Sequence, residues 1–240
     1  IGDDTIGERI LADFARWGVD TSRVRTIKGV PSPLSSVIIE ADGERTIVNY
    51  TDGDLFAADD LVTADDLAGA DAVLADLRWP TGGLSAMRVA ADLGIPSVLD
   101  FDETPERGLT EALTLPTYLV FSAPALAAVA ETVDPAEALL RVAGKTDAWV
   151  AVTLGAKGAL WVDDGVVEHT PAYTVTTVDT LGAGDVYHGA FALGIAESRE
   201  IEDVVKRAAA AAALKCARFG GREGIPTRTE VEDFMKGNTP

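Results

Sequence analysis

Apolar and polar residues alternate with two different periods along this chain, and the period predicts where helices and strands lie. Residues 6–17 carry apolar side chains at three- and four-residue spacing, which predicts an amphipathic helix that stops at Gly18. Two β-prone runs follow at 35–40 and 45–50, and Asp42-Gly43 between them predicts a hairpin. The first part of the chain is therefore expected to be one helix followed by a small β excursion.

Beyond residue 70 the pattern changes to short apolar runs that alternate with helical segments. Single buried strands separated by helices are typical of a parallel sheet that is covered on both faces. Strands are predicted at 72–76, 96–101, 118–121 and 148–153. Helices are predicted at 82–93, 123–131, 135–143, 183–197, 200–218 and 228–236. With a short antiparallel pair at 159–162 and 166–168, the pattern predicts one α/β domain over residues 1–240.

Composition narrows the classes of function. The 240 residues include 20 Lys and Arg against 39 Asp and Glu, a formal net charge of −19. This excess excludes a generic surface for nucleic acid or anionic membrane, because both depend on clustered Lys and Arg. A small anionic ligand stays compatible, since it needs only a local pocket of donors. The single cysteine, Cys216, excludes an intrachain disulfide and a multi-cysteine zinc site and fits a reducing cytoplasm.

The most informative segment runs from Asp179 to Asp185, with the sequence Asp-Thr-Leu-Gly-Ala-Gly-Asp. β-prone residues precede it and a helix-prone run follows, so Gly182, Ala183 and Gly184 are expected at a strand-to-helix junction. The first N–H groups of a helix lack partners and lie at its positive end, which favours binding of a phosphate. The pattern alone leaves two interpretations of Asp185 open. It is either a helix-start carboxylate or a general base that takes a proton from an attacking hydroxyl.

Four segments, in order along the chain, resemble the ribokinase-like, phosphofructokinase-B type carbohydrate kinases. Asp179–Asp185 is the most specific of them, and the others are 18–22, 152–158 and 220–226. The resemblance implies a three-layer α/β/α fold with a mostly parallel central sheet and a small β-sheet lid at about 24–50. It also implies that the N-terminal part of that fold is missing, because family members have a further strand before a segment like Gly2-Asp3-Asp4.

The same resemblance implies roles for individual residues in an ATP-dependent sugar kinase. Asp185 would deprotonate the sugar hydroxyl, and the backbone of Gly182, Ala183 and Gly184 would stabilise the γ-phosphoryl group during transfer. The residues implied for nucleotide binding are Thr153, Gly155, Gly158 and Gly221. These roles agree with the general chemistry, because phosphoryl transfer is mostly positioning and electrostatic stabilisation.

One departure from the family pattern concerns the metal. Many members carry Asn-x-x-Glu after the strand that is predicted here to end at Phe121, whereas this chain has the sequence Ser-Ala-Pro-Ala at 122–125. Mg²⁺ is therefore expected to accompany ATP through water and phosphate oxygens, and we assign no metal ligand. The resemblance also implies a monovalent cation, K⁺, near Asp179 and the 219–225 loop.

The substrate is indicated by segments that resemble bacterial sulfofructose kinases. These segments are 43–50, 75–80, 99–102 and 213–222. The resemblance implies transfer to the C1 hydroxyl of 6-deoxy-6-sulfofructose in sulfoquinovose degradation, with the sulfonate bound by Asn49 and Arg78. A planar guanidinium can give a sulfonate two parallel hydrogen bonds. The competing interpretation is that Arg78 pairs structurally with Asp76 or Asp100.

Other interpretations stay open. Fructose, another ketohexose or tagatose 6-phosphate would need the same motifs, and a non-catalytic sugar- or nucleotide-binding regulator can be built on this fold. Asp100 and Asp102 are read as loop caps or as contacts to water or metal near ATP, and His188 as a packed histidine one turn after Asp185. Apolar alternation in the lid predicts a homodimer through the lid, and the reaction is expected in the cytoplasm.

Overall fold

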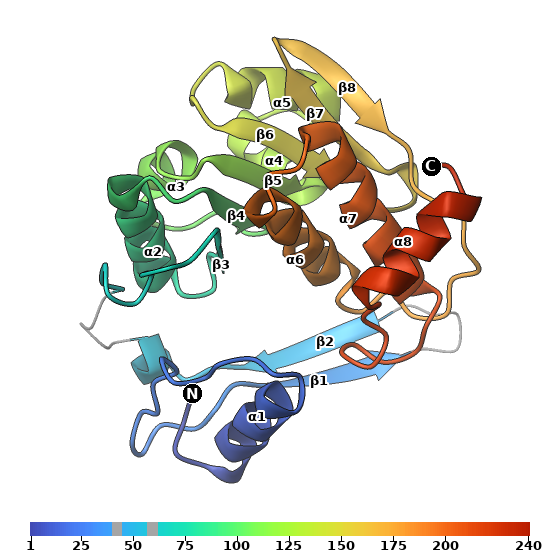
Figure 1. The fold of residues 1–240 in the computed structure, drawn as a ribbon. Helices are drawn as coiled ribbons and strands as arrows, with labels where there is room; N and C mark the ends of the chain where they lie inside the picture. The colour runs from blue at the N-terminus through green and yellow to red at the C-terminus, as the bar shows by residue number, and fades with distance from the viewer. Residues whose placement is uncertain (40–44, 57–61) are drawn as a thin grey trace. The chain divides into compact units, whose positions relative to one another are not determined.

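The computed structural model describes residues 1–39, 45–56 and 62–240 and divides the chain into two compact units, residues 1–61 and 62–240. Each unit is described by itself. Unit 1 contains α1 (Thr5–Arg16), β1 (Leu34–Ile39), β2 (Arg45–Tyr50) and the short 3₁₀ helix η1 (Gly53–Phe56) (Figure 1). The two strands pair antiparallel, which confirms the predicted pairing of these runs, and Leu34 lies opposite Tyr50. The predicted turn at Asp42-Gly43 lies outside the described residues.

Unit 2 is built around a six-stranded sheet in the order β3-β4-β5-β6-β7-β8. Its strands are β3 (Val73–Asp76), β4 (Ser97–Phe101), β5 (Tyr118–Ser122), β6 (Trp149–Thr153), β7 (Ala159–Asp163) and β8 (Val166–Thr170). The first four are parallel to one another, and β7 and β8 extend the sheet as antiparallel strands. The mostly parallel sheet therefore confirms the predicted fold class.

Helices cover both faces of this sheet. They are α2 (Pro80–Leu93), α3 (Leu109–Thr114), α4 (Ala123–Ala130), α5 (Pro135–Ala143), α6 (Ala183–Ala196), α7 (Ile201–Cys216) and α8 (Arg228–Gly237), with the 3₁₀ helix η2 (Gly155–Lys157). α6 and α7 pack side by side (Figure 1). None of the helices in the described part of the chain is long and apolar enough to cross a membrane.

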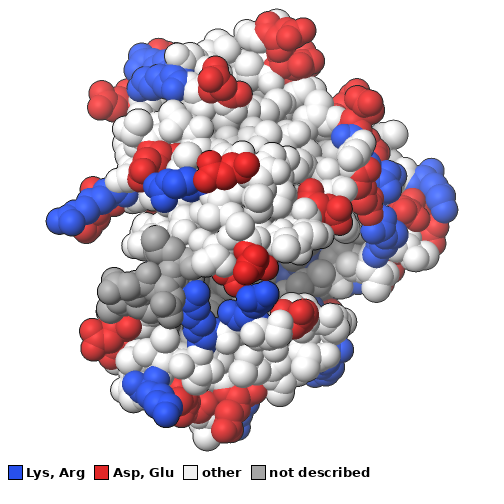
Figure 2. Space-filling model, turned by 60° about the vertical axis from the view of Figure 1, so that its left-hand side comes forward, with Lys and Arg blue, Asp and Glu red and all other residues white. Residues whose placement is uncertain are grey.

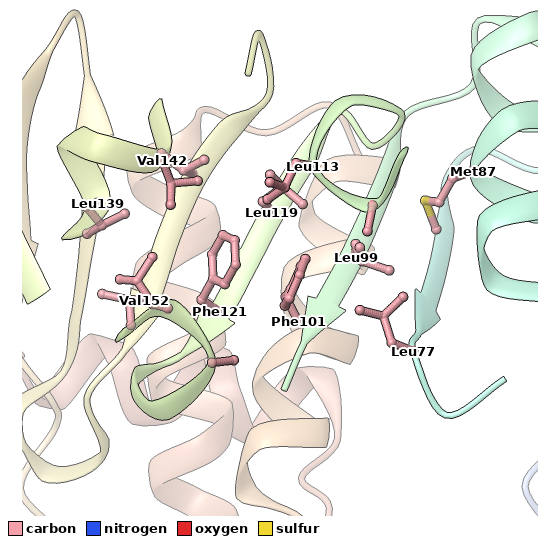
Figure 3. Close-up of a cluster of buried hydrophobic side chains, with 14 of the residues drawn as sticks. Leu77, Met87, Leu99, Phe101, Leu113, Leu119, Phe121, Leu139, Val142 and Val152 are labelled. Carbon is pink, nitrogen blue, oxygen red and sulfur yellow. The ribbon is translucent and has the colours of Figure 1, made fainter. Parts of the chain in front are cut away.

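Alternation along the central strands supplies two hydrophobic cores. Leu99 and Phe101 of β4 point into a cluster with α2 to α5, where the Phe101 ring stacks on that of Phe121 with centroids 4.5 Å apart (Figure 3). Val98 and Val120 belong to a second cluster, with α6 and α7. Successive residues of a strand point to opposite faces, so a strand buried on both faces is continuously apolar. Asp100 interrupts that run in β4, on the face of α6.

The element boundaries differ from the predicted ones mainly where capping decides them. α2 begins at Pro80, two residues before the predicted start, because proline fits the first turn of a helix, where its missing N–H costs nothing. The six-residue α3 was not predicted, and its N-cap is Gly108 in the left-handed conformation, with φ of 79°. Short helices of this kind carry too few residues for a periodic signal.

Candidate active site

The glycine-rich turn forms the N-terminus of α6. Gly182 is the N-cap residue, with φ of 77°, a backbone conformation that other residues adopt only with strain. The N–H of Ala183 donates to Thr180 O (3.2 Å) and that of Val186 to Gly182 O (2.9 Å), so the turn leads directly into the helix. The N–H groups of the first turn lie at the positive end of the helix dipole. The turn therefore provides the local geometry that phosphate binding needs.

The segment before this turn is not the strand that the sequence predicts. Residues 171–182 form no strand, so the junction joins a loop, and not a strand, to α6. The N–H groups of Val178 and Asp179 both donate to Cys216 O, at 2.7 and 3.1 Å. Because these donors pair with the C-terminal end of α7, they are not available to a neighbouring strand. The β-prone composition of the segment is overridden by this tertiary contact.

A cavity of about 420 Å³ lies on one side of the α6 N-terminus. Three of the four residues implied for nucleotide binding line it, together with Ala183 and Gly184 of the predicted anion hole. Those three residues are Thr153, Gly155 and Gly158. The remaining wall is mostly small or apolar side chains, including several alanines of α7 and Cys216. A cavity of this size with a helix N-terminus at one end suits an elongated ligand that carries phosphates.

Gly158 has a structural reason to be glycine in this wall. Its φ is 87°, and a Cβ at this position would lie 2.1 Å from Thr170 O at the end of β8. Its carbonyl accepts a hydrogen bond from Leu154 N–H at 2.7 Å, which closes the turn after β6. The turn therefore packs directly against the backbone that leaves the sheet edge. This close approach fixes the position of one cavity wall.

A second hollow, of about 570 Å³, runs along α6 between α7 and α8, and one end of it reaches the start of α6. It is lined by Gly182, Asp185 and Gly221, so Gly221 lies with the predicted base and not with the other nucleotide residues. A Cβ on Gly182 would lie 3.6 Å from Asp185 Oδ2, which places the carboxylate beside the N-cap. Asp185 is exposed to solvent and thus accessible to a hydroxyl of a ligand.

The buried His188 and the partly buried Asp100 form a pair that the sequence does not predict. Asp100 Oδ2 lies 3.2 Å from His188 Nδ1, and that nitrogen also lies 2.7 Å from Gly184 O in the first turn of α6. Burial, and then the charges of Asp102 and Asp185, raise the pKa of Asp100 to about 7. Burial also lowers the pKa of His188. The pair therefore connects the C-terminal end of β4 to the first two turns of α6.

Arg78 and Asn49, the implied sulfonate ligands, lie in different units. The half-exposed guanidinium of Arg78 contacts Asp102 Oδ2 at 2.7 Å and Glu103 Oε1 at 3.2 Å. Its ion pairs are therefore with these two carboxylates, whereas Asp76 only accepts a hydrogen bond from the Arg78 backbone N–H. Asn49 is exposed on β2, where its Oδ1 accepts from Ser35 Oγ at 2.7 Å. Figure 2 shows one face of the molecule, on which Lys and Arg side chains lie next to Asp and Glu side chains at several places.

A fully buried lysine was also missed. Lys215, in the last turn of α7, has no exposed side-chain surface, and its Nζ donates to Asp179 O (2.9 Å) and Asp179 Oδ2 (3.0 Å). The N–H of Leu181 donates to Asp179 Oδ1 at 2.9 Å, and that of Gly220 to Oδ2 at 3.1 Å. The Leu181 N–H and the Lys215 ammonium lower the pKa of Asp179. In the sequence, Lys215 only flanks an alanine-rich helix, which is typical of a solvated position.

Comparison with known proteins identifies the family. The model of the pfkB family of carbohydrate kinases matches residues 1–228. The chain belongs to the pfkB family. The family predicted from Asp179–Asp185 and the accompanying turns is thereby confirmed, and with it the enzyme class, an ATP-dependent carbohydrate kinase.

Ribokinases are prominent among the relatives of this pfkB-family chain. The ribokinase of Bacillus subtilis is 28% identical over 238 residues, which cover 98% of this chain and 79% of that protein. A structure described as a ribokinase from Agrobacterium tumefaciens is 40% identical with a TM-score of 0.94, covering 99% of this chain and 78% of that one. A ribokinase of Arabidopsis thaliana, solved with ribose and ATP, is 22% identical with a TM-score of 0.82, covering 98% and 80%, and shows the shared fold alone.

Proposed function

We propose that this protein transfers the γ-phosphoryl group of ATP to a hydroxyl of a small sugar, with Asp185 as the general base. The observation that carries the proposal is the position of the α6 N-terminus between two hollows. Ala183 and Gly184 line the cavity assigned to the nucleotide, whereas Gly182 and Asp185 line the second hollow. A phosphoryl group that leaves a donor on one side for an acceptor on the other would pass over the helix N-terminus.

The nucleotide cavity fits ATP in size and in the character of its walls. Small side chains leave room for a flat base, and the wall residues Thr153, Ala183 and Gly184 would hold the phosphates. Bound ATP supplies the phosphoryl group, and Mg²⁺ offsets its charge. Among the residues that the structure describes, no group of three or more His, Cys, Asp and Glu side chains is arranged to hold a metal ion. Mg²⁺ would be held mainly through phosphate oxygens and water, and we assign it no protein ligand.

The residues of this chain would act by proton transfer and by charge stabilisation. Asp185 takes the proton of the attacking hydroxyl, because its exposed carboxylate lies beside the helix start. The N–H groups of the first turn of α6 stabilise the negative charge on the phosphoryl group as it moves. They are fixed in advance by the hydrogen bonds of the turn, so little reorganisation is needed at the moment of transfer.

We further propose 6-deoxy-6-sulfofructose as the acceptor, at its C1 hydroxyl. The supporting observation is a half-exposed guanidinium, that of Arg78, just beyond the C-terminal end of β3. Ligands of open α/β sheets bind outside the carboxyl ends of the strands. Asp102 and Glu103 now hold this guanidinium, so a sulfonate would replace at least one of them. The names of the relatives, which include ribokinases and a fructokinase, make a neutral pentose or hexose the competing acceptor.

A coupled assay of ADP formation tests both levels of this proposal. The wild-type protein is compared on sulfofructose, fructose, ribose, fructose 6-phosphate and tagatose 6-phosphate, each with ATP and Mg²⁺. ADP formation that depends on a sugar supports the kinase assignment, and the highest kcat/KM on sulfofructose supports the acceptor. Tight ATP binding without transfer to any of these sugars contradicts the proposed function and favours a non-catalytic regulator.

The substitution Arg78→Ala separates the sulfonated acceptor from a neutral one. Loss of hydrogen bonds to a charged group should raise KM for sulfofructose by roughly 10–100-fold and change KM for fructose little. Arg88→Ala is the matched control, because Arg88 forms a similar exposed ion pair, with Glu111 at 2.7 Å. An equal loss on both sugars contradicts the sulfonate assignment and indicates a structural role for the Arg78 ion pairs.

We also propose a homodimer through the lid, in the cytoplasm, where ATP is available. Support for the dimer comes from large apolar side chains on the strands of unit 1. Leu34, Ile38, Val48 and Tyr50 are each more than half exposed. A two-stranded sheet is marginal by itself, and covering one face stabilises it. The mass of the protein in solution, compared with that of a Val48→Lys variant, tests this proposal: a wild-type dimer and a monomeric variant are expected.

A further inference from the structure

Lys215 stands out because a charged side chain is rarely buried completely. Its side chain has no exposed surface, although it ends in an ammonium group. Burying an ammonium costs free energy unless strong partners replace water. Both partners in the described structure belong to one residue, Asp179, through its main-chain carbonyl and its carboxylate. A lysine near the end of an alanine-rich helix could reach solvent and would then need no buried partner for its ammonium group.

The ammonium lies where three segments of unit 2 meet. Asp179 begins the turn that leads to Gly182, Lys215 lies in the last turn of α7, and Gly220 begins the loop that continues to Gly221. The carboxylate of Asp179 accepts from Leu181 N–H on one oxygen and from both Lys215 and Gly220 N–H on the other. Two further hydrogen bonds, to Cys216 O, tie the same turn to the end of α7. The Lys215–Asp179 ion pair therefore lies only three residues before Gly182, the N-cap of α6.

These contacts are incompatible with the monovalent cation that the family resemblance implies near Asp179. K⁺ would need a set of oxygen ligands between the turn and the 219–225 loop. In this chain two of the available oxygens, Asp179 O and Oδ2, already bind the Lys215 ammonium at hydrogen-bond distance. A second positive charge beside a buried ammonium would be repelled strongly at low dielectric. The residues present therefore do not fit K⁺ at this position.

We propose that the Lys215 ammonium is a built-in cation that positions the N-terminus of α6, and that the protein consequently works without a monovalent metal ion. The inference rests on the proposed kinase function for its catalytic readout. Lys215 is a positioning residue, because it lies beneath the turn and acts through Asp179. It neutralises the carboxylate and binds a main-chain carbonyl, which are the two tasks that a bound K⁺ would perform there.

The first test needs no substitution. ADP formation by the wild-type protein is measured with tetramethylammonium as the background cation, because this ion is too bulky to enter a buried site. KCl or NaCl is then titrated in at constant ionic strength. We expect kcat to change by less than about twofold, since the charge is already supplied by the protein. Activation by K⁺ of several fold or more, with no matching effect of tetramethylammonium, overturns the proposal.

The second test removes the charge. Lys215→Met keeps most of the side-chain volume, and we expect kcat to fall by roughly 10–100-fold with little change in KM, because the anion hole shifts. Lys206→Met is the matched control on the same helix, since Lys206 is partly exposed and pairs with Glu202 at 2.6 Å. Wild-type kcat in a folded Lys215→Met variant contradicts a positioning role.

A third measurement does not depend on catalysis. Lys215→Ala leaves space and two oxygens for an ion, so K⁺ should raise the Tm of this variant and leave the wild-type Tm unchanged. Equal stabilisation of both proteins by K⁺ overturns the inference, even if no sugar is phosphorylated. Absence of any phosphoryl transfer, with the expected Tm pattern, contradicts the proposed function alone. If Lys215→Met does not fold, the wild-type titration still decides.

Discussion

Two regions beside the α6 N-terminus, the nucleotide cavity and the charged residues at the ends of β3 and β4, are built from different kinds of residue. On the nucleotide side the wall consists of backbone turns and small side chains, with Gly155, Gly158 and several alanines. Beneath the helix and at the ends of β3 and β4, charged groups dominate, namely Asp100, Asp102 and Arg78. The first region is specified by shape, and the second by charge. Substitutions in the nucleotide cavity should therefore change its shape and the stability of the fold. Substitutions among the charged residues should change the pH dependence of stability and the selectivity for the sugar.

The largest effect is expected at Asp185, in the first turn of α6. Asp185→Asn removes the proton acceptor but keeps the shape, so kcat should fall by ~10²–10⁴-fold with a modest change in KM for ATP and sugar. Steady-state kinetics measure this, and the variant should unfold at a Tm close to that of the wild type. Near-wild-type turnover would show that Asp185 is only a favourable helix-start residue.

The next effect tests shape on the nucleotide side. Gly158→Ala places a Cβ 2.1 Å from Thr170 O at a φ of 87°, so it should destabilise the fold by roughly 3 kcal/mol or more and raise KM for ATP. Gly155→Ala is the matched control: its φ is 58° and a Cβ meets nothing within 4 Å, so only the left-handed strain of about 1–2 kcal/mol is expected. Chemical denaturation and ATP titration measure the two variants. Equal losses would argue against the close contact as the cause.

A smaller effect, visible in its pH dependence, tests the charged side. Burial raises the pKa of Asp100 to about 7, above its unfolded value of about 4, so the folded protein holds this proton more tightly. The stability from this group is complete below the unfolded pKa and is lost as pH rises toward 7. Asp100→Asn should remove that loss, which is at most about 4 kcal/mol.

Denaturant unfolding from pH 4 to 8 measures the Asp100 effect. Asp92→Asn, an exposed position on α2, is the control for a general charge change. Burial lowers the pKa of His188, so protonation of this side chain at low pH destabilises the fold, in the opposite sense to Asp100. The difference between Asp100→Asn and wild type at each pH measures the carboxylate together with its effect on His188, its partner at 3.2 Å. A difference that does not vary with pH would contradict the shifted pKa.

Sequence periodicity predicts most of the fold because burial on two faces leaves a strong local signal. The run around Leu119 is continuously apolar, that around Leu99 is interrupted only by Asp100, and helices such as α5 and α8 carry recognisable caps. α3 and the loop at 171–182 are the exceptions. The first is too short for a pattern, and the second is shaped by hydrogen bonds to Cys216, which is distant in sequence.

The candidate site also has a part that the sequence predicts and a part that it does not. The glycine-rich turn is local, so its position at the start of α6 follows from the sequence. The pairing of Asp100 with His188, of Arg78 with Asp102 and Glu103, and of Lys215 with Asp179 joins residues that are far apart along the chain. No spacing rule predicts such contacts. The roles of Thr153, Gly155, Gly158 and Gly221 stay predictions, although their places around the two hollows are known.

The alternation in β4 has a consequence for which changes in length the chain tolerates. Leu99 and Phe101 face one core while Asp100 faces α6, so one inserted residue in this strand would exchange the two faces. A carboxylate would enter an apolar cluster and a phenylalanine would displace the partner of His188. Insertions of a single residue should therefore be absent from β4 in functional descendants of this chain. Deep insertion scanning would find tolerated positions in the connecting loops instead.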